Sequence, residues 1–164
     1  MAFRFMPTGW FEWSGRIPQS SSSLRAYPAL GAAPFVDYRL NDIASIGFMP
    51  EVTLNVIPKA AEGYPVSAMV AGSLRVKVQY PGSRFALPYV LLAPGYSSLF
   101  GYGGNGSGSS NGFVVGAYAG ARIPISARQS IFAEVGYMHG FQRDSEHDFA
   151  PSYVVIAAGW QASL

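Results

Sequence analysis

The sequence predicts an all-β fold, an eight-stranded antiparallel up-and-down β-barrel that crosses a membrane. Hydrophobic residues make up 49% of the 164 residues and charged residues only 12%, whereas soluble domains carry about 25% charged residues. No stretch of about 18 uncharged apolar residues is present, so a transmembrane helix is not expected. Turn signals divide the chain into eight alternating or apolar segments. A closed barrel is the other structure that satisfies its backbone hydrogen bonds in lipid.

The predicted strands follow one another along a single barrel domain that covers residues 1–164. They are expected at 9–17, 24–40, 45–57, 66–80, 85–99, 112–125, 130–142 and 152–164. The gaps between them alternate in length: long at 18–23, 58–65, 101–111 and 143–151, and short at 41–44, 81–84 and 126–129. Four long loops on one side and three short turns on the other are typical of an up-and-down membrane barrel.

Charged residues of the predicted strands fall on one face of each strand, because side chains alternate with period two. The segment 130–142 is an example, in which Glu134 lies opposite a face formed by Ile131, Val135 and Tyr137. In chain order, the first strand contributes Glu12 and Arg16, the second Arg25, Asp37 and Arg39, the third Glu51, the fourth Arg75 and Lys77, the sixth Arg122 and the seventh Glu134.

The charged face is expected to line the barrel interior and the apolar face to meet lipid. A lipid-facing Arg or Lys costs roughly 2 to 4 kcal/mol at the bilayer midplane, and an eight-stranded barrel has just enough room inside for side chains. Glu51 or Glu134 paired with Arg75 or Arg122 would close the lumen. Aromatic residues near segment ends are expected to form interfacial girdles, namely Tyr38, Tyr80, Phe85, Tyr96, Phe113, Tyr137, Phe141 and Trp160.

Several other function classes have little support in the sequence. The net charge is +2 with scattered basic residues, and no cysteine is present, so nucleic-acid binding, disulfides and thiol chemistry are not expected. Ser145, His147 and Asp148 crowd one loop instead of lying on rigid elements, so no enzymatic activity is expected. The same loop lacks the calcium-loop glycine spacing, and no metal or cofactor is expected. The candidate loop-binding residues are Tyr102, Asn105, Asp144, Glu146, His147 and Asp148.

Nearly the whole chain resembles the eight-stranded bacterial outer-membrane barrels of the OmpA and OmpX type. "APFVDYRLNDIASIGF" is similar to their strand, tight turn and strand unit, and "SARQSIFAEVGYMHGF" followed by "SYVVIAAGWQASL" is similar to their closing hairpin and last strand. The chain differs from them in ending with Leu164, where an aromatic residue is usual. It also carries prolines inside predicted strands, at Pro28, Pro34, Pro50, Pro88, Pro94 and Pro124.

The resemblance implies a mature chain in the bacterial outer membrane, from which a signal peptide has been removed. Its candidate partners are the lipid bilayer, lipopolysaccharide and a protein bound at the long loops, and the barrel is expected to be monomeric. We expect a plugged, ion-paired interior with a structural or anchoring role and surface loops for binding. A narrow pore for small solutes or ions and a soluble lipocalin-like ligand-binding barrel are the alternatives, and a hydrolase that acts on lipid comes last.

Overall fold

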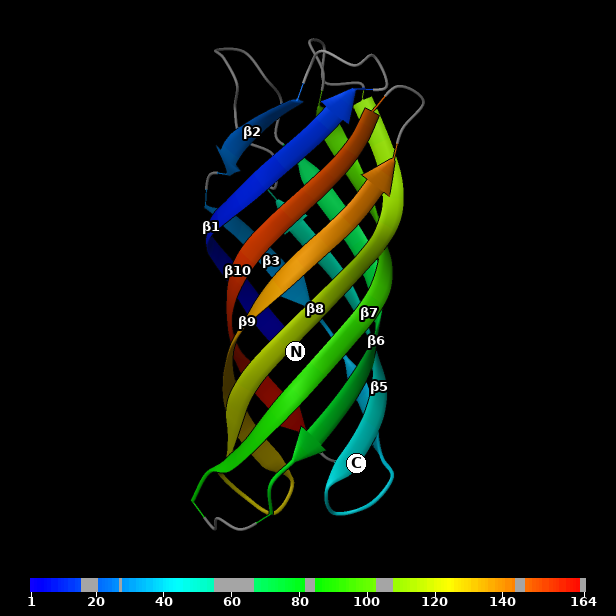
Figure 1. Ribbon diagram of the computed structural model, residues 1–164. Helices are drawn as coiled ribbons and strands as arrows, with labels where there is room; N and C mark the ends of the chain where they lie inside the picture. Colours follow the sequence, from blue (N-terminus) through cyan, green and yellow to red (C-terminus); the bar gives the residue numbers. More distant parts are fainter. Residues whose placement is uncertain are drawn as a thin grey trace.

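The protein is a closed antiparallel β-barrel whose tilted strands wrap around a single interior (Figure 1). The computed structural model describes residues 1–15, 21–26, 28–54, 67–81, 85–102, 108–143 and 147–162. For 2–4, 8–15, 21–26, 102, 147 and 149 it describes the backbone alone. No helix within the described ranges is long and apolar enough to span a bilayer.

The strands follow in chain order and pair mainly with their neighbours in sequence. They are β1 (Ala2–Gly15), β2 (Ser21–Ala26), β3 (Ala29–Ala33), β4 (Val36–Arg39), β5 (Ala44–Leu54), β6 (Ala68–Gln79), β7 (Leu87–Tyr102), β8 (Gly108–Pro124), β9 (Gln129–Arg143) and β10 (His147–Ala162). β1 pairs with β10, which closes the sheet into a ring.

The ring contains eight barrel strands, as the sequence predicts. β2, β3 and β4 together form its second strand, because β1 pairs with β2 and β3 while β5 pairs with β3 and β4. The breaks between them fall at Pro28 and at Pro34 with Phe35, where a proline cannot donate to the ladder. The predicted strand 24–40 therefore exists as three consecutive pieces.

The structure corrects several predicted boundaries. β1 begins at Ala2, not at residue 9, and contains a register shift between Phe5 and Thr8. This irregularity at Pro7 interrupts the alternation that would have revealed the strand. The strands also include residues that the sequence assigned to long loops, namely 21–23, 101–102, 108–111 and 147–151. Their Gly, Ser and charged residues are typical of loops, yet backbone pairing continues through them.

The two faces of the sheet differ in the way the sequence predicts. Glu134 is buried, whereas Ile131, Val135 and Tyr137 point outward and are between 43% and 55% exposed. Outward-facing Val, Leu and Ile side chains likewise cover β5, β6, β7 and β10. In a water-soluble protein this much exposed apolar surface would be unfavourable, because burying such surface is what stabilises a fold in water.

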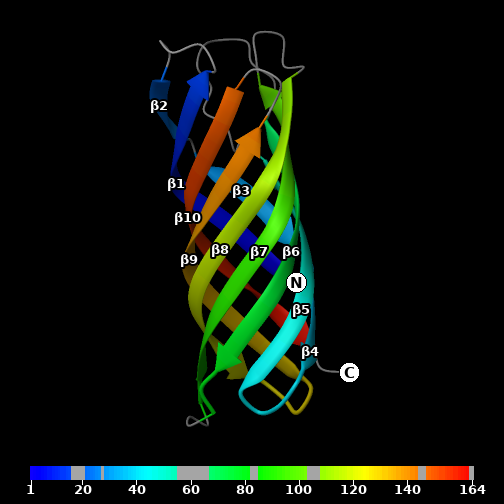
Figure 2. The same cartoon turned by 45° about the vertical axis from the view of Figure 1, so that its right-hand side comes forward.

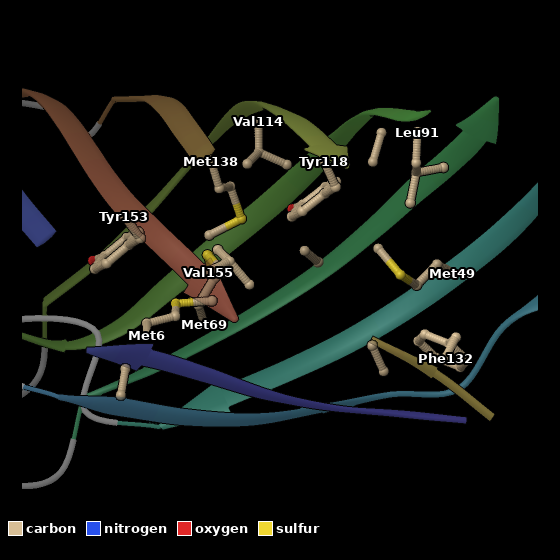
Figure 3. Packing of buried hydrophobic residues seen from close by; sticks show 14 of the residues in the cluster. Met6, Met49, Met69, Leu91, Val114, Tyr118, Phe132, Met138, Tyr153 and Val155 are labelled. Atoms are coloured by element: carbon tan, nitrogen blue, oxygen red, sulfur yellow. The ribbon is translucent and has the colours of Figure 1, made fainter. Parts of the chain in front are cut away.

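Charged side chains are not the only groups that fill the barrel interior. Figure 3 shows a cluster of buried apolar side chains inside the barrel, with Met6, Met69 and Val155 lying together. Met69 pairs with Leu99 across β6 and β7, and each is at most 1% exposed. This apolar layer, which also contains Ala29, Val114, Met138 and Tyr153, was not predicted from the charge pattern.

Candidate functional site

Asp37 is the centre of a buried charge cluster near the end of the barrel that carries the short turns. Its carboxylate accepts hydrogen bonds from Arg75 Nε at 3.0 Å and from Lys77 Nζ at 2.8 Å. The Asp37 and Arg75 side chains are 3% and 2% exposed. Ion pairs are therefore present in the interior, and the acid that pairs with Arg75 is Asp37, which is also among the predicted interior residues.

A glycine in the intervening strand makes this ion pair possible. Asp37 on β4 and Arg75 on β6 both stand opposite Gly47 of β5 in the sheet register. Strands two apart are separated by roughly 9 to 10 Å, so the two side chains must reach across the middle strand. A Cβ atom at Gly47 would collide with Asp37 Oδ1 and with the carbonyl oxygen of Val36. Gly47 thus keeps open the space in which the pair forms.

The same arrangement occurs at a second position inside the barrel. Tyr89 on β7 donates its hydroxyl hydrogen to Glu134 Oε2 on β9 at 2.9 Å. Both residues stand opposite Gly120 of β8. A Cβ at Gly120 would lie 2.8 Å from the Tyr89 hydroxyl oxygen, so this glycine too leaves room for a contact between its two neighbours.

A third pair lies at the opposite end of the interior. Gln142 Nε2 on β9 donates to Ser97 Oγ on β7 at 2.5 Å. The residue between them in the register is Gly112 of β8. Three interior polar contacts therefore bridge a glycine on the central strand of a three-strand group. The sequence signal was available, because a glycine inside a strand often marks a close approach, but the pairing could not be read without the register.

Aromatic and sulfur groups complete the surroundings of the basic side chains. The Arg75 guanidinium lies 4.3 Å from the centre of the Phe35 ring, and its Nη1 donates to Met49 Sδ at 3.3 Å. Lys77 Nζ lies 5.7 Å from the centre of the Tyr89 ring. These cation–π contacts stabilise charges that have been removed from bulk water. The term interior network is used below for the group formed by Asp37, Arg75, Lys77, Tyr89 and Glu134.

The other predicted interior residues are distributed more widely. Glu51 is buried and accepts a hydrogen bond from Thr53 Oγ1 at 2.9 Å. Arg122 is half-buried, whereas the Arg39 side chain is 66% exposed and pairs with Asp42 at the β4–β5 turn. Arg39 therefore lies outside the buried cluster, because its strand has already reached the rim. Arg16 lies outside the described residues, and Glu12 and Arg25 are described by backbone pairing alone.

The candidate loop residues are only partly described. Asn105, Asp144 and Glu146 lie outside the described residues, and Tyr102 and His147 are described by backbone alone. Asp148 forms an ion pair with Arg143 Nε at 2.7 Å across β9 and β10. In the described part of the chain, no group of His, Asp and Glu side chains is arranged to hold a metal ion.

A cavity of about 760 Å³ opens at the short-turn end of the barrel. Its lining includes Asp37 and Lys77 of the interior network, together with Arg122, Arg39 and Trp160. Met1, whose amino group donates a hydrogen bond to the carbonyl oxygen of Trp160 at 2.7 Å, also lines this cavity. The Nε of Arg122 is buried and has no hydrogen-bond partner among the described residues.

Aromatic side chains project outward near both ends of the barrel. At the short-turn end these are Tyr38, Tyr80, Phe85 and Trp160, all exposed. Toward the other end, Tyr96 and Phe113 form an edge-to-face pair at 5.6 Å, and Phe141 packs edge-on against His139 at 4.5 Å. All eight residues assigned to girdles from sequence are exposed in the structure.

Comparisons with known proteins give a match at the level of fold. No protein-family model matches the sequence, and the search of curated proteins finds no relative. Among solved structures, Neisserial surface protein A is 12% identical, with a TM-score of 0.55 over 99% of this chain and 96% of that one. The outer membrane protein OprG from Pseudomonas aeruginosa is 11% identical, with a TM-score of 0.53 over 98% of this chain and 94% of that one. The chain therefore has the fold of the eight-stranded outer-membrane β-barrels.

Proposed function

We propose that the protein is an integral barrel of the bacterial outer membrane with a closed interior. The barrel anchors the long surface loops, and its role is structural or binding and not catalytic. The observation that carries the proposal is where the exposed charged side chains lie on the barrel. The exposed charged side chains of the described residues, Arg39, Asp42, Arg128 and Arg143, lie at strand ends or turns. Between the two sets of outward aromatics, the described outer surface is uncharged.

This distribution agrees with the requirements of a bilayer. The uncharged zone would face the hydrocarbon region, where a basic side chain is costly, and the aromatic side chains at both ends would lie at the lipid–water interfaces. Inside, buried apolar side chains and the interior network are in contact, since Arg75 donates to Met49 and Tyr89 belongs to both groups. Together they support an interior that fills with side chains and not with a water column.

The first experiment compares folding in plain buffer with folding in detergent micelles, measured by circular dichroism and by gel mobility before and after boiling. We expect β-structure and a heat-sensitive mobility shift in detergent alone. A monomer that folds in plain buffer would contradict the membrane proposal and favour a soluble ligand-binding barrel. A detergent-folded barrel that produces discrete current steps in a planar bilayer would retain the membrane location but replace the closed interior with a pore.

A further inference from the structure

Two polar side chains inside the short-turn end of the barrel lack hydrogen-bond partners. The Nε of Arg122 and the hydroxyl oxygen of Ser45 are buried, and neither has a partner among the described residues. No acidic side chain in the described part of the chain forms an ion pair with Arg122. A buried polar group without a partner is unfavourable, and more so when it is charged. Both groups can donate a hydrogen, so a bound acceptor would satisfy them.

Ser45 and Arg122 line the same cavity, together with Lys77. Ser45 stands directly opposite Lys77 in the register of β5 and β6, and Arg122 comes from β8. Figure 2 shows the first residues of β5 and the last residues of β6 and β8 at the same end of the barrel. Lys77 Nζ donates to Asp37, and an ammonium group carries three hydrogens. Donors from three strands therefore surround one space.

The strands that carry these donors are paired on both sides at the positions concerned. Ser45 pairs with β4 and β6, Lys77 with β5 and β7, and Arg122 with β7 and β9. The backbone of each donor is therefore held by the sheet and does not depend on the ends of the chain. A binding site on rigid strands is more precise than one on loops.

The side chains that line the cavity carry more positive than negative charge. The bases of the lining are Arg39, Lys77 and Arg122, and the acids are Asp37 and Asp42. Both acids are already paired, Asp42 with Arg39 and Asp37 with Arg75 and Lys77. Arg122 is the base of this lining that has no acid among the described residues. Its positive charge therefore favours a bound anion, because a hydrogen bond between charged groups is strong.

The arrangement of the donors indicates which anion fits. A guanidinium binds either a carboxylate or a phosphate through two parallel hydrogen bonds. The Ser45 hydroxyl, which can rotate to suit a ligand, and the Lys77 ammonium approach from other strands than Arg122. Donors from several directions suit a tetrahedral phosphate, because a planar carboxylate offers only two oxygens in one plane.

We propose that this cavity binds a phosphate group, with Arg122 as its main ligand and with further hydrogen bonds from Ser45 and Lys77. The short turns of outer-membrane barrels lie on the periplasmic side, so the ligand enters from there. Free phosphate, a small phosphate ester and a lipid headgroup share this chemistry, and the experiment below separates these sources. Binding can be measured whether or not the interior conducts, and also on a barrel that folds in plain buffer.

The test is isothermal titration calorimetry of the protein folded in an uncharged detergent. The probes are inorganic phosphate, glycerol phosphate and phosphatidic acid in mixed micelles, and acetate at equal ionic strength is the carboxylate control. We expect saturable binding of phosphate that weakens as sodium chloride is added. Acetate should bind roughly tenfold more weakly or worse, because it leaves part of the donors unpaired. Binding of glycerol phosphate identifies a soluble source, and binding of phosphatidic acid alone identifies a lipid.

Substitutions separate the role of Arg122 from a general effect of charge. Arg122→Gln should weaken phosphate binding roughly tenfold or more, and Ser45→Ala roughly two- to tenfold. The matched control is Arg128→Gln, which removes the same charge at the same end of the barrel. Arg128 is exposed in the β8–β9 turn and is not part of the cavity lining, so this variant should bind as the wild type does. The heat-sensitive mobility shift shows that each variant has folded.

Several results would overturn the phosphate site. Acetate that binds as tightly as phosphate would remove the selectivity, and this comparison needs only the wild-type protein. Absence of binding by all of the phosphate probes would also overturn the proposal. So would unchanged binding in folded Arg122→Gln, or an equal loss in Arg122→Gln and Arg128→Gln.

Discussion

Asp37 holds two buried basic side chains, and its removal is the most direct test of the interior network. Asp37→Ala leaves Arg75 and Lys77 without their acid in a site from which most water is excluded. Removing one partner of a buried ion pair costs roughly 3 to 5 kcal/mol. We expect the free energy of unfolding to fall by this amount. Urea titration of the protein in lipid vesicles measures it.

The matched control is Asp42→Ala. Asp42 also pairs with an arginine, but its side chain is 89% exposed, and exposed pairs contribute at most about 1 kcal/mol. If both alanine variants unfolded at the same urea concentration as the wild type, Asp37 would have no structural role in the interior.

Gly120 lies between two side chains that meet above it, so it should not tolerate a methyl group. In Gly120→Ala the new Cβ would press on Tyr89 and on the carbonyl oxygen of Ala133. Overpacking of this kind costs roughly 1 to 3 kcal/mol, and the Tyr89–Glu134 hydrogen bond would be displaced. Gly72→Ala is the control, because its Cβ would meet only the Phe48 ring, at 3.3 Å. Equal unfolding free energies for the two variants would contradict the packing argument.

The outward face of each strand is expected to accept apolar residues only. Val135 lies near the middle of β9 and is 55% exposed. Val135→Arg should lower the unfolding free energy in vesicles by roughly 2 to 4 kcal/mol, because the guanidinium would face hydrocarbon. Ile125→Arg, in the β8–β9 turn and equally outward, should change it by less than about 1 kcal/mol. Similar effects at both sites would show that Val135 does not face lipid.

The prolines within strands show how the elements tolerate local interruptions. Pro94 lies on β7, where the pairing with β6 is interrupted between Ser73 and Val76 without a change of register. Pairing with β8 continues through the same position, with Pro94 opposite Val115. The strand therefore loses part of one ladder, which is the expected effect of a missing N–H donor.

The barrel as a whole should be closed to ions, because the apolar layer lies across its interior. Met69 and Leu99 face each other in that layer and are fully buried. We expect no current steps from the wild type in a planar bilayer. The double variant Met69→Ala, Leu99→Ala should admit current, since it removes two large buried side chains from the apolar layer. Its unfolding free energy should fall by roughly 4 kcal/mol or more. Wild-type current steps, or a double variant as closed as the wild type, would contradict this account.

Much of this architecture was predictable from local pattern. The number of barrel strands, the inward direction of Glu134 and the outward direction of Val135 follow from period-two alternation and from the cost of charge in lipid. The aromatic residues near segment ends were also identified correctly as outward-facing. These features depend on sequence spacing within one strand or on turn residues between two, so they are readable along the chain.

Other features depend on register and were not predictable. Asp37 is adjacent to Arg75 only because both stand opposite Gly47, and Tyr89 meets Glu134 only across Gly120. The start of β1 was hidden by the shift at Pro7. Alternation therefore determines which face each residue occupies, whereas contacts between distant strands are decided by closure of the ring, which sets the register of every strand against its neighbours.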